Sequence, residues 1–130
     1  MSDRKKVMII DDEKDLLEEL SIRMESCQWD VIIASNGLEG LEMVKKGKPD
    51  LIVLDVVMPK MNGYQVCRSL KADPATQHIP IILLTAMAQA NDKAYGKEMG
   101  ASDYLSKPCD VRVLIEKMKV LLNQPAISQS

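Results

Sequence analysis

The sequence predicts a single α/β domain built on a parallel sheet with helices on both faces. Short apolar runs recur at residues 7–10, 31–34, 51–54 and 81–84, and a weaker fifth run lies at 104–105. The runs do not alternate apolar with polar residues, so we expect both faces of every strand to be buried, as in parallel sheets. Their first residues lie 20 to 30 positions apart, which leaves room for one helix between consecutive strands.

Helical periodicity fills the gaps between these runs. The first helix is predicted by Leu16, Leu20, Met24 and Cys27, the second by Leu38, Leu41 and Val44, and the last by Val111, Leu114, Ile115, Met118, Leu121 and Leu122. A fourth helix around residues 91–99 has the weakest apolar stripe. We therefore expect that fourth helix to be the loosest.

Helix starts and stops are also marked. Asn36 with Glu39, and Asn62 with Gln65, have the spacing of capping boxes that begin the second and third helices. Gly47 and Gly100 stand where helices should end, because glycine adopts the left-handed cap conformation without a Cβ penalty. Residues 1–124 are expected to form the domain, and residues 125–130 a flexible tail or the start of a linker.

Composition limits the function. The chain has 130 residues, 46% of them hydrophobic, and its 17 Lys and Arg against 19 Asp and Glu give a net charge of −2. There is no global basic field, so direct nucleic-acid binding is disfavoured. No apolar stretch is long enough to span a bilayer or act as a signal peptide. We expect a soluble, cytoplasmic protein that does not bind membranes, whose three scattered cysteines, Cys27, Cys67 and Cys109, are reduced.

Polar residues follow the predicted strands. Asp11 and Asp12 end the first, Asp55 the third and Thr85 the fourth, and the fifth leads into Lys107. Ligands bind outside the carboxyl ends of strands in an open parallel sheet, so these side chains should converge on one edge. Any one of them alone is more often a helix cap, a turn residue or a solvated charge. The prediction of a site therefore depends on the whole set.

That set indicates a particular chemistry. Three carboxylates repel one another unless a cation compensates, and an all-oxygen, partly open site suits Mg²⁺ or Mn²⁺. A divalent ion beside Lys107 would stabilise the charge that develops as a phosphoryl group moves onto a carboxylate. An aspartyl phosphate is the natural product.

The chain resembles the receiver domain of two-component response regulators over nearly its whole length, from Val7 to Leu122. The matching segments are IIDDE at 9–13, LDVVMPKMNG at 54–63, LTA at 84–86 and GASDYLSKP at 100–108. This resemblance implies a doubly wound, flavodoxin-like (βα)5 fold whose five parallel strands have the order 2-1-3-4-5.

The resemblance also implies roles for individual residues. Asp55 would be the phosphoacceptor, taking a phosphoryl group from a sensor histidine kinase or a histidine phosphotransfer protein. The metal would be held by Asp11, Asp12, Asp55 and the backbone carbonyl of Val57. Lys107 would pair with the phosphoryl oxygens, and the peptide bond before Pro108 would be cis.

By the same resemblance, Thr85 and Tyr104 would form the switch. Thr85 would hydrogen-bond the phosphoryl group, Tyr104 would turn inward, and the face of helix four, strand five and helix five would report the state to an unknown downstream protein or effector domain. Tyr104 could instead be a fixed cover with its hydroxyl in water. The domain would be a monomer or a phosphorylation-dependent dimer, free-standing or cut from a longer regulator.

Two positions depart from the common family pattern, because Val57 and Met87 stand where many members have polar residues. These positions flank the path of the water that hydrolyses the phosphoryl bond in the family. We therefore predict slow autodephosphorylation. Apart from accepting the phosphoryl group and slowly losing it, the domain is not expected to be an enzyme.

Two rival functions use a similar fold. An aspartyl-phosphate hydrolase of the haloacid dehalogenase type needs a second Asp two residues after the nucleophile, where this chain has Val57. A flavodoxin-like nucleotide or flavin binder needs a Gly-rich or Ser/Thr-rich phosphate loop after the first strand. Without a metal, the carboxylates of Asp11, Asp12 and Glu13 would repel a phosphate there.

Overall fold

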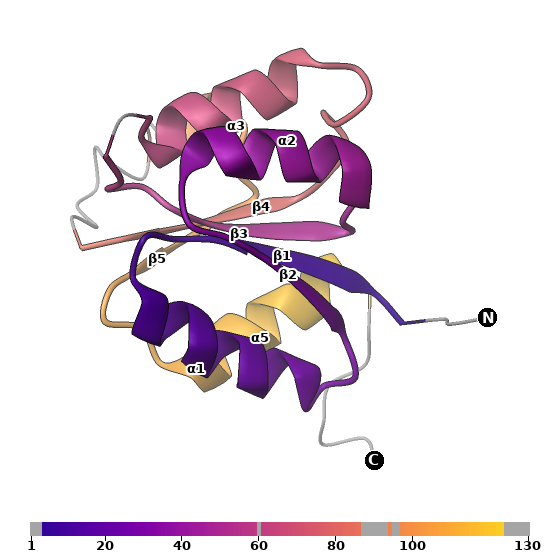
Figure 1. Ribbon diagram of the computed structural model, residues 1–130, viewed down its shortest axis with the longest axis vertical. Coiled ribbons are helices and arrows are strands. Elements are labelled where there is room, and N and C mark those ends of the chain that lie inside the picture. The colour runs from indigo at the N-terminus through magenta and orange to yellow at the C-terminus, as the bar shows by residue number, and fades with distance from the viewer. Residues whose placement is uncertain (1–3, 60, 87–93, 95–96, 124–130) are drawn as a thin grey trace.

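The computed structural model describes residues 4–59, 61–86, 94 and 97–123. Five parallel strands form one sheet in the order β2-β1-β3-β4-β5 (Figure 1). The strands are β1 (Lys6–Ile10), β2 (Asp30–Ala34), β3 (Leu51–Asp55), β4 (Ile81–Thr85) and β5 (Asp103–Ser106). The predicted α/β class and the strand order are confirmed.

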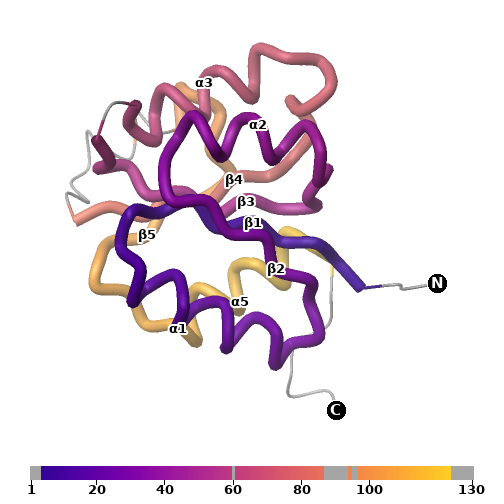
Figure 2. Tube along the Cα trace, viewed as in Figure 1, coloured from indigo at the N-terminus to yellow at the C-terminus, as the bar shows by residue number. Residues whose placement is uncertain are grey.

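Helices cover both faces of the sheet. α1 (Lys14–Glu25) and α5 (Val111–Leu121) lie on one face, and α2 (Gly37–Gly47) and α3 (Gly63–Ala72) on the other (Figure 1). After β2 the chain crosses back over the sheet, so that β3 pairs with the free side of β1 (Figure 2). The predicted fourth helix at 91–99 lies mostly outside the described residues, and the predicted tail at 125–130 lies entirely outside them.

The sheet separates two apolar cores because alternate residues of a strand point to opposite faces. In β1, Val7 and Ile9 pack beneath α1 and α5, while Met8 and Ile10 pack beneath α2 and α3. All four side chains are fully buried. Burying one such side chain stabilises the fold by roughly 1.5–3 kcal/mol, so the central strands fix the positions of the residues that follow them.

The expectation that every strand is buried on both faces is wrong for β2 and only partly met by β5. β2 is an edge strand, and Ile33 is 46% exposed. β5 forms the other edge, and its residues are half-buried or exposed. A helix layer covers central strands better than edges, so an apolar edge strand looks like a central one in the sequence but not in the fold.

The predicted apolar stripe of α2 is also partly wrong. Leu38 is 55% exposed, whereas Gly37, Gly40 and Val44 are buried. α2 lies so close to the sheet that a Cβ at position 40 would lie 2.5 Å from Ile10 Cδ1. The helix therefore turns its glycines toward the sheet, and the larger Leu38 faces outward.

The capping predictions hold in full at Asn62 and Gly100 and only in part at Asn36 and Gly47. Asn62 and Gln65 form a complete capping box at the start of α3. Asn36 caps α2, but the Glu39 carboxylate accepts from the backbone N–H of Ser35 rather than closing the box. Gly100 has a φ of +100° as predicted, whereas the left-handed residue after α2 is Lys48, one position beyond Gly47.

Two further expectations can be compared with the described residues. None of the helices there is both long enough and apolar enough to cross a membrane. Cys27, Cys67 and Cys109 are free thiols, of which only Cys67 is buried.

Candidate functional site

Four of the predicted site residues come together at the carboxyl edge of the sheet. Asp11 directly follows β1, and Asp55 is the last residue of β3, which pairs with β1. Both carboxylates are buried, and Asp12 beside them is exposed. One carboxylate oxygen from each of the three lies within 4.8 Å of the others. Lys107 is the fourth residue.

The Lys107 ammonium group lies among these carboxylates. Its Nζ is 2.8 Å from Asp11 Oδ2, 3.5 Å from Asp55 Oδ2 and 3.4 Å from Glu13 Oε1. The backbone at this residue is fixed to the neighbouring strand, because the Lys107 N–H donates to the Thr85 carbonyl at 2.7 Å. The peptide bond to Pro108 is cis, as predicted. A single ammonium group thus faces a surplus of negative charge.

The pKa of Asp55 is raised by its burial and by this surplus of negative charge. Burial raises the pKa of its carboxyl, and the charge of Asp11 raises it further, while Lys107 and the Val57 N–H act the other way, giving a pKa of about 6. Burial alone lowers the pKa of Lys107, but the hydrogen bond and charge of Asp11, with Asp55 and Glu13, outweigh it and leave that pKa raised. The site would gain stability from a second cation.

The donor set matches a small divalent ion. All three side chains offer carboxylate oxygens, the ligands that Mg²⁺ and Mn²⁺ prefer, and one edge of the cluster is open at Asp12. The Asp11 carboxylate is held by a second contact, accepting from the Glu13 N–H at 2.9 Å. Its orientation is therefore set before any ligand arrives.

The chain that follows Asp55 turns back on the site. The Val57 N–H donates to Asp55 Oδ1 at 3.3 Å, and the Val57 side chain is 55% exposed. The Gly63 N–H donates to the Val56 carbonyl at 2.8 Å. A Cβ at position 63 would lie 2.3 Å from the Asp55 carbonyl oxygen, so only glycine allows α3 to begin here.

Two contributions were missed by reasoning from the sequence. Gly63 lies in the matching segment at 54–63 and Glu13 in that at 9–13, but neither was given a role. Their roles come from contacts across the fold, with the Asp55 carbonyl and with Lys107. Glu13 directly follows Asp11 and Asp12 in the sequence, and this adjacency could have predicted that it lies near Lys107.

The two predicted switch residues lie on neighbouring strands. Thr85 is fully buried at the end of β4, and its register partner is Ser106 on β5. Tyr104 is half-buried, and its hydroxyl lies 3.2 Å from the hydroxyl of Tyr64 on α3. The hydroxyl is thus bonded within the protein rather than only to water. Met87, the second departure from the family pattern, lies outside the described residues.

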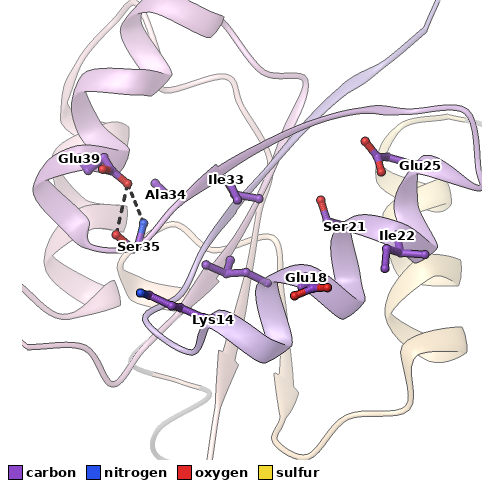
Figure 3. A pocket seen from close by; sticks show the side chains of 10 residues that line it. Lys14, Glu18, Ser21, Ile22, Glu25, Ile33, Ala34, Ser35 and Glu39 are labelled. Atoms are coloured by element: carbon purple, nitrogen blue, oxygen red, sulfur yellow. Dashed lines mark hydrogen bonds between the residues drawn. The ribbon is translucent and has the colours of Figure 1, made fainter.

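A pocket of about 610 Å³ lies elsewhere, between α1 and the edge strand β2 (Figure 3). In it, the Glu39 carboxylate accepts from the backbone and hydroxyl of Ser35 (Figure 3). None of the clustered carboxylates lines this pocket. A different pocket, of about 500 Å³, adjoins Lys107 and is lined mainly by Leu16, Ala86, Pro108, Val111, Glu13 and Glu19.

Comparison with known proteins gives a consistent result. The model of the response regulator receiver domain matches residues 7–119. Protein PilH of Pseudomonas aeruginosa is 37% identical over 117 residues, covering 90% of this chain and 97% of that protein. A crystal structure of a putative response regulator from Chloroflexus aurantiacus superposes with a TM-score of 0.87 at 32% identity, covering 93% of this chain and 99% of that one.

Longer proteins contain the same region. The DNA-binding dual master transcriptional regulator RpaA of Synechocystis is 39% identical over 119 residues, which cover 92% of this chain but 49% of that regulator. The chain therefore spans about half the length of some of the curated relatives that it matches.

Proposed function

This chain belongs to the response regulator receiver domain family, and on that premise we propose that Asp55 is the residue through which it is phosphorylated. Receiver domains are phosphorylation-activated signalling switches of two-component systems. The observation that carries the assignment is the position of Lys107, whose Nζ contacts both Asp11 and Asp55 beside three clustered carboxylates. Asp55 is the last residue of the central strand β3, and it is buried.

In the proposed reaction, an Asp55 carboxylate oxygen attacks the phosphorus of a phosphohistidine on a partner protein. The new P–O bond forms as the P–N bond breaks, and the departing imidazole nitrogen takes up a proton from solvent. Lys107 neutralises charge on the phosphoryl oxygens, and the Val57 N–H holds the Asp55 carboxylate in place. Thr85 would hydrogen-bond the transferred group.

We also propose that Asp11, Asp12, Asp55 and the Val57 carbonyl hold Mg²⁺ or Mn²⁺. When bound, the ion supplies charge stabilisation for the phosphoryl oxygens. The clustering of three carboxylate oxygens within 4.8 Å of one another supports this assignment, and the pKa of Asp55, raised first by burial and then by the charge of Asp11, is consistent with it. Asp11 already accepts a hydrogen bond from Lys107, so we expect it to contact the metal largely through water.

We propose that the donor histidine belongs to a sensor histidine kinase or a histidine phosphotransfer protein. The chain has a single histidine, His78, which is exposed in the connection between α3 and β4, away from the carboxylates. The pocket beside Lys107 combines apolar Leu16 and Pro108 with acidic Glu13 and Glu19. We assign it to docking of a sensor histidine kinase or a histidine phosphotransfer protein.

The output would pass through Thr85 and Tyr104 to the face formed by the fourth helix, β5 and α5. Phosphorylation adds charge and acceptor oxygens only locally, so a neighbour with two positions is needed to relay it. The half-buried Tyr104 on an edge strand suits that role. Its target would be a downstream protein or an attached effector domain.

The rival function as an aspartyl-phosphate hydrolase is not favoured. Such an enzyme needs an acid or base two residues after the nucleophile, where this chain has the apolar, exposed side chain of Val57. Slow loss of the phosphoryl group to water would be the domain's own reaction.

The assignment is tested by intact-mass spectrometry after incubation with a small-molecule phosphodonor and Mg²⁺. Wild-type protein should gain one phosphoryl group and Asp55→Asn none, because the amide is not a nucleophile of this kind. Glu42→Gln, an exposed carboxylate change on α2, should behave as wild type. Phosphorylation of Asp55→Asn in the same yield as wild type would show that another residue accepts the group.

A further inference from the structure

We propose that Tyr64 is a positioning residue for the switch, whose hydroxyl holds Tyr104 in an inward position and biases the domain toward the state that phosphorylation favours. This inference rests on the proposed function, in which Tyr104 responds to a phosphoryl group on Asp55. Tyr64 lies outside the acidic cluster, and the resemblance to the receiver family implied no role for it.

The contact between the two tyrosines sets the direction of Tyr104. Their hydroxyl oxygens are 3.2 Å apart, and both side chains pack against the core beneath α2 and α3. Tyr104 belongs to β5, an edge strand, whereas Tyr64 belongs to a helix on the sheet face. A bond from the edge strand to α3 points the Tyr104 ring back over the sheet rather than away from it.

Tyr64 is itself held rigidly with respect to the phosphoacceptor. It is the second residue of α3 and lies within the capping box formed by Asn62 and Gln65. It directly follows Gly63, which packs against the Asp55 carbonyl. The Gly63 N–H also bonds the Val56 carbonyl. The contacts of Gly63 with Asp55 and Val56 thus hold the start of α3 against the end of β3. The Tyr64 hydroxyl therefore offers Tyr104 on β5 a partner whose backbone is fixed.

Tyr104 is also placed where it can respond to Thr85. Leu83 is the register partner of Tyr104, and it lies in the core beneath α2 and α3. Residues two apart on a strand share a face, so Thr85 lies on the same face as Leu83 and Tyr104. An inward Tyr104 would therefore fill the space that Thr85 leaves when it moves toward the phosphoryl group. Stabilising the inward position of Tyr104 then favours the displaced position of Thr85.

The bond should be worth a measurable bias. One net hydrogen bond between neutral groups changes an equilibrium by about fivefold. When only a fraction of the protein molecules has the conformation that binds a ligand, the apparent affinity for that ligand is proportional to this fraction. Removing the Tyr64 hydroxyl should therefore weaken binding of a phosphoryl mimic at Asp55, although Tyr64 does not belong to the acidic cluster.

The test uses beryllofluoride with Mg²⁺ as the phosphoryl mimic on the whole chain. Its half-saturating concentration is measured by calorimetry, and the Tyr104 side chain is followed by fluorine NMR of protein labelled with meta-fluorotyrosine. The Tyr104 resonance is identified by its loss in Tyr104→Phe. Tyr64→Phe keeps the ring and removes only the hydroxyl, and thermal melting checks that the variant is folded.

In wild type, beryllofluoride should move the Tyr104 resonance to a new limit. In Tyr64→Phe without the mimic, that resonance should lie further from the limit than in wild type, and half-saturation should need about fivefold more beryllofluoride. In a Tyr104→Phe background the same substitution should leave half-saturation unchanged, because the partner hydroxyl is already gone.

An unchanged or lower half-saturating concentration in Tyr64→Phe would overturn the role of Tyr64. So would an equal effect in the Tyr104→Phe background, which would mean that Tyr64 acts on the site by another route. If beryllofluoride fails to bind wild type, or binds without moving the Tyr104 resonance, the proposed function fails instead, at Asp55 or at the switch respectively.

Discussion

At the residue scale, Asp55 combines two demands that oppose each other. Its carboxylate is only 3% exposed, yet it must be ionised to act as a nucleophile. Burial and the neighbouring Asp11 raise its pKa to about 6, and Lys107 limits the rise. Ionising Asp55 therefore costs the fold some stability, and the raised pKa places the titration of this nucleophile close to neutral pH.

This conflict predicts how Asp55→Asn affects stability without divalent ions. A carboxyl whose folded pKa lies above its unfolded value of 3.8 costs the native state stability as pH rises from about 4 to about 6. The amide carries no such cost, so the variant should be more stable than wild type above pH ~6, by at most about 3 kcal/mol. Below pH ~4 this advantage should vanish.

The measurement is urea unfolding of both proteins across that pH range in buffer with a chelator. Glu42→Gln controls for the loss of an exposed carboxylate. A constant difference between wild type and Asp55→Asn at every pH would mean that Asp55 titrates normally in the fold.

Val57 supports a second prediction at the same scale. Its backbone N–H donates to the Asp55 carboxylate, while its exposed side chain is apolar and offers no hydrogen bond to a water molecule. Orienting an attacking water contributes substantially to rate, so we expect a long-lived phosphorylated state. Val57→Asn combined with Met87→Glu should speed loss of the phosphoryl group without greatly changing its acquisition.

That lifetime is measured by removing the donor and following decay of the phosphorylated species at one Mg²⁺ concentration. Ile22→Asn, a change to an equally exposed apolar residue on α1, is the control. Equal or slower decay in the double variant would show that these positions do not control the attacking water here.

At the scale of elements, the start of α3 is the most constrained junction of the site. A methyl group at position 63 would meet the Asp55 carbonyl, and the other atoms nearest to it are backbone atoms of Asp55 and Val56, which have little freedom to move. At position 40 the methyl would meet Ile10 Cδ1, the end of a flexible side chain. The same substitution should therefore have different consequences at the two glycines.

Gly63→Ala should destabilise the protein by more than about 2 kcal/mol and impair phosphorylation, because the strain falls on Asp55 itself. Gly40→Ala should cost less, since alanine is about 1 kcal/mol better than glycine within a helix and only the Ile10 side chain, not the backbone, would have to move. Chemical denaturation ranks the two variants. A larger loss for Gly40→Ala would show that α2, not α3, is the rigid element.

At the scale of the whole molecule, the acidic cluster links folding to the metal. Asp11, Asp12 and Asp55 come from two separate strand ends, and the unfolded chain does not hold them together. A ligand that binds only the native state stabilises it by mass action. Mg²⁺ should therefore raise the melting temperature in a concentration-dependent way.

Asp12→Ala should remove most of this response, because Asp12 is the exposed carboxylate at the open side of the cluster. Asp15→Ala, an exposed change in the first turn of α1, should keep it. Thermal melts over a Mg²⁺ series measure both variants. A full metal-dependent shift in Asp12→Ala would mean that Asp12 is not a ligand.

Much of this molecule is determined by its sequence alone. Apolar runs, helical stripes and the capping box at Asn62 are local signals, and together they predicted the class of the fold and the nine elements of the described residues. Asp11, Asp12, Asp55 and Lys107 were predicted to converge because parallel strands end at one edge, and the structure brings these four together. Such predictions succeed when position along a strand fixes position in space.

Only the tertiary structure decided what depends on how elements pack against one another. The exposure of Ile33 at the sheet edge and the outward turn of Leu38 follow from neighbours that are distant in the sequence. The same is true of the contact of Gly63 with Asp55 and of the pairing of Tyr64 with Tyr104, 40 residues apart. No periodicity encodes these contacts, because each depends on the distance between two elements rather than on the pattern within one.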